Sequence, residues 1–454
     1  MSENKYITTP VPSKKIPAGI PYILANEAAE RFSFYGMTSI LVIFMTTHLM
    51  GQNGTLQVMG DEEAKSWFHF FKSAVYFLPI AGALLSDIWL GKYRTILYFS
   101  IVYCVGFFAL TIDNTRFGLG AGLVLIAIGG GVIKPCVSAN VGDQFGKMNQ
   151  HLMSKIYGWF YFAINLGAAI SMALCPWLRI KFGPRIAFGI PTLFMLIATL
   201  AFWLGRKKYV HVPAAGANFV REVFSGEGIK SLGKLCIIYL FVAMFWALFD
   251  QSQSAWVLQA TKMDLTVFGI ELLPEQPQAF NPVLVMIMIP LFSYVIYPAI
   301  DKVFRLTALR KISIGLFVAA LSFVVPALIE MWIQAGATPH INWQLLAYVI
   351  LTAAEIMVSI TCLEFSYTQA PKKMKSFVQA VFLLSISLGN AFTGAVNWFI
   401  KNEDGTSKLA GASYYWFFTL MMAITAIVFI FIAMGYREKS HIQDENSEEA
   451  TNQQ

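Results

Sequence analysis

Charged residues are scarce in this sequence. Of its 454 residues, only 13% are Asp, Glu, Lys or Arg, whereas 57% are hydrophobic. Average soluble domains carry about 25% charged residues, and a soluble chain of this length would divide into about three domains. The shortage of charge excludes an ordinary soluble protein and places the chain among membrane proteins.

Cysteine is also rare, and it shows no metal-binding or disulfide pattern. The five cysteines are an odd number, include no C-x-x-C pair and all lie in apolar segments. We therefore expect them to pack as small hydrophobic side chains, and we expect no metal site. They are Cys104, Cys136, Cys175, Cys236 and Cys362.

Several functional motifs are missing as well. The sequence contains no G-x-x-x-x-G-K-[ST] loop for ATP, no H-E-x-x-H zinc motif and no serine nucleophile with a basic partner. "FNPV" occurs once, at 280–283, and does not resemble the paired half-helix motif of a channel. No basic stripe with interleaved aromatics indicates nucleic-acid binding. We therefore expect neither an enzyme nor an ATP-driven pump, and no cofactor.

Long apolar runs fill most of the chain. Each has about 20 residues, enough to cross a hydrocarbon core of about 30 Å as a helix. The first run lacks a small-residue cleavage site, so we expect it to be retained rather than removed as a signal peptide. The pattern predicts an all-α membrane protein with twelve transmembrane helices, near 19–48, 67–90, 94–112, 118–142, 155–178, 186–205, 233–260, 281–303, 310–334, 343–369, 376–400 and 413–435.

A polar connection divides these spans into two groups of six. We predict a first six-helix bundle at 19–205, a linker at 206–232 and a second bundle at 233–436. The linker contains Pro, Gly, Ser and charged residues that do not suit a bilayer. Polar tails lie at 1–18 and 437–454, and we expect the second to be disordered. Two six-helix halves are typical of alternating-access carriers, whose substrate site lies near the midplane between the halves.

Basic residues concentrate in alternate loops. By the positive-inside rule, this asymmetry places these loops, the linker and both termini in the cytoplasm of a multi-pass protein of the cell membrane. The formal net charge of +7 is thus mostly a matter of topology. The basic loop residues are Lys92, Arg94, Arg206, Lys207, Lys208, Arg305, Arg310, Lys311, Lys372, Lys373 and Lys375.

Three ionisable side chains lie close together in the first span. An ionisable group at membrane depth costs several kcal/mol unless it is paired or faces a cavity. Glu27, Glu30 and Arg31 follow i, i+3, i+4 spacing, so they share one helical face, and Tyr35 lies one turn further on that face. The face is either a polar stripe aimed at a partner helix or water, or a cluster that snorkels to the interface.

Further ionisable residues lie in other spans. Charge complementarity alone predicts an ion pair between Lys134 and Asp250, which either breaks as the halves move or is static. His69 is either a proton site or a packing residue, and Lys72 has the option of snorkelling outward. The group consists of His69, Lys72 and Tyr76 in the second span, Lys134 in the fourth, Asp250 in the seventh, and Glu355 and Glu364 in the tenth.

Taken together, the motifs resemble the proton-dependent oligopeptide transporter (POT) family of the major facilitator superfamily. The E-x-x-E-R of "NEAAERFSFYG" at 26–36 resembles the family signature, "GALLSDIWLGKYRT" at 82–95 the loop after the second helix, and "FYFAINLGAAIS" at 160–171 the fifth-helix signature. "FWALFDQSQSAWVLQAT" at 245–261 and "LEFSYTQAPKKMKSFVQA" at 363–380 resemble animal peptide transporters. The resemblance covers nearly all of the membrane portion.

The resemblance implies a proton-coupled symporter that imports di- and tripeptides and acts as a monomer. It implies that protons are coupled through Glu27, Glu30, Arg31, His69 and Asp250. It also implies that Arg31 and Lys134 attract the peptide carboxylate and that Glu355 receives the amino terminus. The remaining implied lining residues are Tyr35, Tyr76, Asn165, Trp246 and Asn281.

The sequence departs from the family pattern at Phe34, Lys72, Cys136 and Phe382, which leaves the side-chain preference of the substrate open. The alternative function is transport of nitrate or of amino acids on the same fold. A nitrate carrier has no need of an acid such as Glu355 at an ammonium position.

Overall fold

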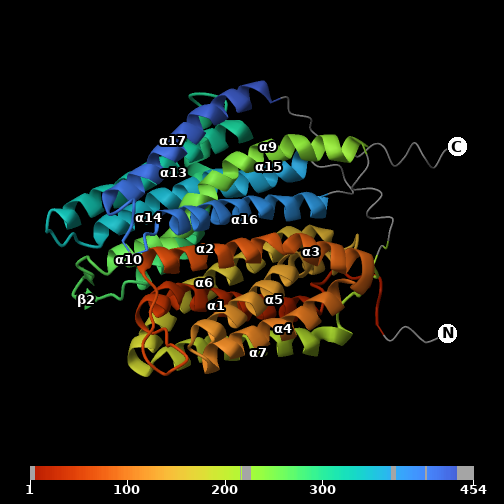
Figure 1. Ribbon diagram of the computed structural model, residues 1–454. Coiled ribbons are helices and arrows are strands. Elements are labelled where there is room, and N and C mark those ends of the chain that lie inside the picture. The colour runs from red at the N-terminus through yellow and green to blue at the C-terminus, as the bar shows by residue number, and fades with distance from the viewer. Residues whose placement is uncertain (1–5, 215, 217–225, 370–374, 404–405, 437–454) are drawn as a thin grey trace.

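The computed structural model describes residues 6–214, 216, 226–369, 375–403 and 406–436, which are almost entirely helical (Figure 1). The tail at 437–454 lies outside these residues, as do 215 and 217–225 of the predicted linker. Eleven stretches of the described chain are long and apolar enough to cross a membrane. The first helix, with 28 residues, is as long but contains Glu27, Glu30 and Arg31. With it the twelve predicted spans are present, and the predicted all-α membrane fold is confirmed.

The first half of the molecule contains the helices up to residue 207. Several of them end or begin at residues suited to that role: Thr115 accepts a hydrogen bond from Gly118 N at the start of α5, and Gly183, with φ +83°, turns the chain into Pro184 of α7. The elements are α1 (Ile20–Thr47), α2 (Asp61–Phe77), α3 (Pro79–Leu85), the π-helix η1 (Ser86–Leu90), α4 (Lys92–Ile112), α5 (Arg116–Asp143), the 3₁₀ helix η2 (Gln150–Leu152), α6 (Met153–Phe182), α7 (Pro184–Leu204) and η3 (Gly205–Lys207).

The second half repeats this pattern with more interruptions. Its seventh span breaks at the 3₁₀ helix η4 (Asp250–Gln253), and two spans contain π-helical turns. The elements are α9 (Gly226–Phe249), α10 (Ala255–Ala260), β1 (Thr266–Val267), β2 (Ile270–Glu271), η5 (Gln276–Ala279), α11 (Phe280–Leu291), η6 (Phe292–Ile296), α12 (Tyr297–Asp301), α13 (Ala308–Gln334), α14 (Asn342–Glu355), η7 (Ile356–Ile360), α15 (Thr361–Gln369), α16 (Lys375–Ile400) and α17 (Ala412–Gly435).

Each half has its own hydrophobic core. One cluster of buried side chains runs through α1 to α7, and another runs through α9 to α17. In Figure 1 the first half, red to yellow-green, lies beneath the second half, green to blue. We call the end at which α1 begins and α17 ends the terminal end, and the opposite end, with α10 and the β1–β2 hairpin, the far end.

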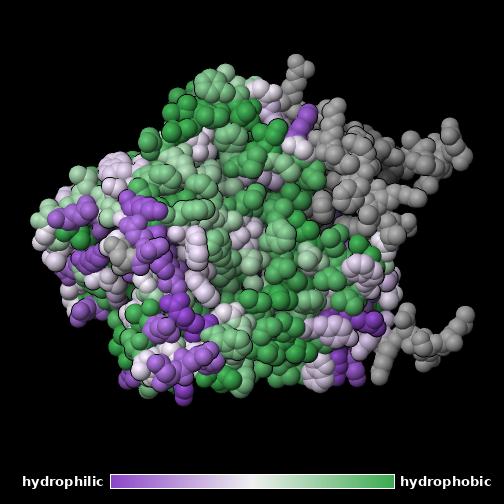
Figure 2. Space-filling view, viewed as in Figure 1, coloured by the Kyte–Doolittle hydropathy of each residue, from purple (hydrophilic) through white to green (hydrophobic). Residues whose placement is uncertain are grey.

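The outer surface suits a bilayer. Hydrophobic side chains cover the middle of the face in Figure 2, and hydrophilic ones gather mainly at the far end on the left. Large apolar side chains such as Phe117, Trp89 and Leu420 are 72%, 69% and 63% exposed. A soluble protein rarely exposes so much apolar surface, so we interpret it as the lipid-facing surface.

Candidate functional site

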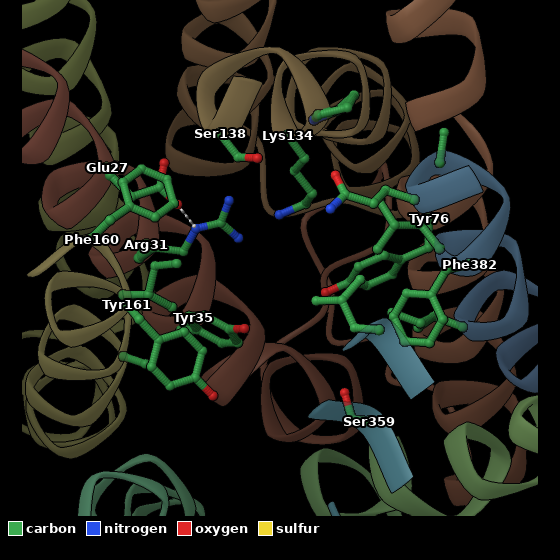
Figure 3. Close-up of a pocket in the computed structure, with 18 of the residues that line it drawn as sticks. Glu27, Arg31, Tyr35, Tyr76, Lys134, Ser138, Phe160, Tyr161, Ser359 and Phe382 are labelled. Carbon is green, nitrogen blue, oxygen red and sulfur yellow. Dashed lines mark hydrogen bonds and ion pairs between the residues drawn. The ribbon is translucent and has the colours of Figure 1, made fainter. Parts of the chain in front are cut away.

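A cavity of about 430 Å³ lies between the two halves. Its lining runs from Asp87 and Lys92, near the terminal end, to Gln253 and Asn281 deeper in the molecule. The volume falls within the range of about 300–1,000 Å³ that is typical of small-molecule sites. Figure 3 shows side chains from both halves pointing into this space.

The charges of α1 form a compact buried cluster beside the cavity. Arg31 Nε lies 2.7 Å from Glu27 Oε1 and 2.8 Å from Glu30 Oε2. Tyr103 of α4 donates a hydrogen bond to Glu30 Oε1 at 3.1 Å. All three charged residues are at most 9% exposed, and the end of the guanidinium group points into the cavity (Figure 3). The snorkelling alternative is therefore wrong for this cluster.

The cluster depends on close packing of α6 against α1. A Cβ atom on Gly167 of α6 would lie 2.7 Å from Ala28 O and 3.5 Å from Arg31 Cβ. Only glycine permits this approach without a shift of one helix. The small residue in the "NLG" segment thus helps to hold the charged face of α1 in place.

Lys134 of α5 brings a second cation to the cavity. Its Nζ lies 4.0 Å from Glu30 Oε1 and 4.2 Å above the ring of Phe34. The ammonium is buried and has no hydrogen-bond partner within the described part of the chain. An anionic group entering the cavity would therefore find a desolvated cation ready to bind it.

Glu355 faces the cavity from the second half. It is the last residue of α14, directly before the π-helical turn η7. Asn281 Nδ2 donates to Glu355 Oε2 at 2.9 Å and to Thr352 Oγ1 at 3.0 Å. The asparagine thus holds one carboxylate oxygen in place, in the half opposite Arg31 and Lys134.

Aromatic and amide side chains complete the lining. Tyr35, Tyr76 and Trp246 line the cavity, and the indole N–H of Trp246 is buried without a hydrogen-bond partner among the described residues. Asn165 also lines it, although its amide donates to Tyr161 O at 2.9 Å.

Sequence reasoning did not identify several lining residues. Tyr161 lies one helical turn before Asn165, so the spacing within the "FYFAINLG" motif contained the signal that would have found it. The other lining residues have hydroxyl or amide side chains, and their sequence positions gave no such signal. These residues include Ser138, Gln253 and Ser359.

The structure corrects the predicted ion pair between Lys134 and Asp250. Asp250 Oδ1 lies 3.1 Å from Lys72 Nζ, and these two side chains are 3% and 2% exposed. Lys72 points from α2 across the interface to η4, so it does not snorkel outward. Lys134 lies instead beside Glu30 and Phe34, within its own half.

His69 also lies at the interface between the halves. It is fully buried, with Nδ1 2.8 Å from Asn390 Oδ1 and Nε2 2.9 Å from Ser254 Oγ. It does not line the cavity. Glu364 is not part of the cavity lining either.

Polar contacts join the halves from their middle to the far end. Arg179 donates from Nε to Glu275 Oε1 at 2.8 Å, and both side chains are at most 6% exposed. Gln278 donates to Ser39 O at 3.1 Å, and Lys401 Nζ lies 2.9 Å from Glu63 Oε2. The cavity lining reaches Asp87 and Lys92 on the opposite side of these contacts. The described halves are therefore closed at the far end and separated toward the terminal end.

Replacing Arg179 with Gln is expected to open the far end. The change leaves Glu275 buried without its cation, which destabilises the closed arrangement by about 3–5 kcal/mol. Spin labels at the exposed positions Phe182 and Phe268 should then report a larger population of long distances by pulsed electron paramagnetic resonance. The double replacement Arg179→Gln with Glu275→Gln removes both charges and should shift the distances less. Equal distance distributions in all three proteins would show that this pair does not hold the far end closed.

Comparison with known proteins finds one family model and several relatives that match this chain. The family model described as "POT family" matches residues 93–226 and 221–417. Peptide transporter family 1 of Drosophila melanogaster is 38% identical over 378 residues, which cover 73% of this chain and 49% of that protein. Solute carrier family 15 member 2 of Homo sapiens is 35% identical over 397 residues, which cover 76% and 53%. The chain spans about half the length of these curated relatives.

Solved structures match over almost the whole chain. A crystal structure of an auto-inhibited POT family peptide transporter has a TM-score of 0.84 and 32% sequence identity, and the match covers 95% of this chain and 99% of that one. The in meso crystal structure of the POT family transporter PepTSo has a TM-score of 0.84 and 34% identity, with 93% and 99% covered.

Proposed function

Because the chain belongs to the POT family, we propose that it is a secondary active symporter that imports di- and tripeptides together with protons by alternating access. The relatives bear the names peptide transporter and solute carrier family 15, and solved neighbours are described as peptide transporters. The family resemblance of the sequence motifs agrees with these findings.

The observation that carries the proposal is the division of charge across the cavity. Arg31 and Lys134 present positive groups from the first half, and Glu355 presents a carboxylate from the second. A zwitterionic dipeptide has an ammonium group and a carboxylate group about 7 Å apart when extended. Such a ligand is complementary to both sides at once, so its binding draws the halves together. Since every unmodified short peptide has these two termini, we expect the site to accept many different peptides.

Proton coupling is proposed to use the cluster on α1. Glu27 and Glu30 share the guanidinium of Arg31, and Lys134 lies near Glu30. Protonation of one carboxylate releases positive charge for the peptide carboxylate. Peptide and proton then both favour the state in which this positive charge is released, so the binding of each strengthens the binding of the other.

The same reasoning supports an orientation in the cell membrane. Lys92, Arg94 and the basic residues at 206–208 lie at the terminal end, and by the positive-inside rule they support a cytoplasmic location for this end. The far end, closed by the Arg179–Glu275 pair, then faces outward. The structure is thus interpreted as an inward-facing state of a monomer.

Uptake into liposomes tests this function. The purified protein should concentrate labelled dialanine inside liposomes when the outside is more acidic, and a protonophore should abolish the accumulation. Free alanine and nitrate serve as competing substrates in the same assay. Accumulation of nitrate or alanine without that of dialanine would favour the alternative transporter classes and contradict peptide transport.

A further inference from the structure

The proposed transport cycle assigns no role to Lys72, yet Lys72 is among the most buried charged side chains of the described residues. It lies on α2 one helical turn after His69 and is 2% exposed. Its ammonium contacts Asp250 of η4 at 3.1 Å. The pair therefore bridges the two halves, and a chain of hydrogen bonds links it to His69.

The hydrogen bonds fix the orientation of the connecting asparagine. Asn390 of α16 donates through Nδ2 to Asp250 Oδ2 at 2.6 Å and to Ile386 O at 3.0 Å. Both partners are acceptors, so Asn390 Oδ1 faces His69. His69 Nδ1, 2.8 Å away, must therefore carry a hydrogen and donate it. Nε2 is left facing the hydroxyl of Ser254 at 2.9 Å, which is able to donate to it.

Charge balance decides the protonation of the imidazole. Lys72 already compensates Asp250, and both are buried. On α2, Lys65 lies one turn before His69 and is paired with Glu62 at 2.7 Å. Helix α16 has no ionisable side chain from residue 376 to 400, and Asp250 is the only one in η4 and α10. A proton on His69 would add a buried positive charge between two lysines with no carboxylate left to pair it.

We propose that Lys72 is a built-in counter-ion for Asp250 that takes the place of a proton on His69, so that His69 is a neutral hydrogen-bond bridge between the halves rather than a carrier of the coupling proton. The statement that His69 carries no coupling proton rests on the proposed function, whereas the statement that His69 is neutral does not. In this assignment His69 and Lys72 are positioning residues, and proton coupling is confined to the α1 cluster.

Removing Lys72 reverses the charge balance. In a Lys72→Met variant the Asp250 carboxylate is buried without a cation, and Asn390 connects it directly to His69. A proton on His69 then supplies the missing positive charge. The contact between the halves should become dependent on acid, whereas Lys72→Met combined with Asp250→Asn should restore a neutral interface that needs no proton.

Nuclear magnetic resonance of protein labelled with ¹⁵N-histidine tests the protonation state without any transport. The chain has six histidines, and the His69 signals are those lost in His69→Gln. His69 should stay neutral, with its hydrogen on Nδ1, from about pH 5 to 8 in the unmodified protein, and it should titrate in Lys72→Met. Lys65→Met combined with Glu62→Gln is the matched control, because it removes the other neighbouring lysine together with the carboxylate that it compensates, and it should leave the His69 signals unchanged. Titration of His69 in the unmodified protein would overturn the proposal, as would its absence in Lys72→Met.

Steady-state accumulation gives a second measurement. If His69 carries no coupling proton, His69→Gln should change the rate of dialanine uptake but not the final ratio of internal to external dialanine at a given pH gradient. Lys72→Met should transport only at acid pH, and the double variant with Asp250→Asn should lose this acid requirement. A lower accumulation ratio in His69→Gln would assign the coupling proton to His69 and refute the proposal. Failure of the unmodified protein to accumulate dialanine would contradict the proposed function, while the magnetic resonance result would still decide the state of His69.

Discussion

Replacing Glu30 with Gln is expected to abolish proton-driven accumulation of dipeptide. The variant should bring labelled dialanine only to the concentration present outside, even under a strong pH gradient. Exchange of labelled external peptide for preloaded internal peptide should continue, because counterflow requires no net movement of protons. Measuring both activities on the same liposomes separates loss of coupling from loss of folding.

The geometry around Glu30 explains this expectation. Its carboxylate is 2.8 Å from Arg31 Nε, 3.1 Å from the hydroxyl of Tyr103 and 4.0 Å from Lys134 Nζ. It therefore touches both cations that we assign to the peptide carboxylate. Gln keeps the shape and the hydrogen bond from Tyr103 but stays uncharged at every pH. Lys134 then has lost its neighbouring carboxylate at every pH, and Arg31 keeps only Glu27 as a charged partner, so peptide binding no longer depends on protonation of Glu30.

Persistence of gradient-driven accumulation in Glu30→Gln would show that the coupling assignment is wrong. Glu27 would then be the first alternative, because its Oε1 lies 2.7 Å from the same guanidinium nitrogen. Loss of counterflow together with accumulation would instead indicate damage to the peptide site or to the fold.

The sequence contained strong signals for the fold and for part of the site. Apolar runs of about 20 residues allow few structures other than membrane helices, because a bilayer satisfies no exposed backbone groups. The charged face of α1 was predictable because Glu27, Glu30 and Arg31 lie within one and a half turns of a single helix. Spacing within one helix determines which side chains share a face, so such local predictions need no tertiary information.

Contacts between helices were not predictable in the same way. Charge complementarity alone paired Asp250 with Lys134, and the sequence contains no measure of whether the helix of Lys134 or that of Lys72 lies closer. The break of the seventh span at η4 brings Asp250 to the face of α2, where Lys72 reaches it. Lys134 is held within the first half beside Phe34. The choice between them depends on helix packing rather than on pattern.

Replacing Glu355 with Gln is expected to weaken the binding of peptides that have a free amino terminus. The side chain belongs to the second half, and Asn281 holds one of its oxygens at 2.9 Å. In a desolvated site, removing one partner of a charge pair costs about 2–5 kcal/mol, which corresponds to about 30- to 4,000-fold in affinity. Gln keeps the shape of the side chain and is able to accept from Asn281, so the loss should reflect the missing charge.

A peptide with an acetylated amino terminus provides the decisive comparison for Glu355. It has no ammonium group, so it should bind the unmodified protein poorly and lose little further in Glu355→Gln. Competition against labelled dialanine measures both affinities in both proteins. Glu364→Gln is the matched control, because it removes a carboxylate from the same span that does not line the cavity, and it should leave both affinities unchanged. If free and acetylated peptides lose affinity equally in Glu355→Gln, Glu355 does not bind the amino terminus, and the peptide orientation proposed between the two halves is wrong.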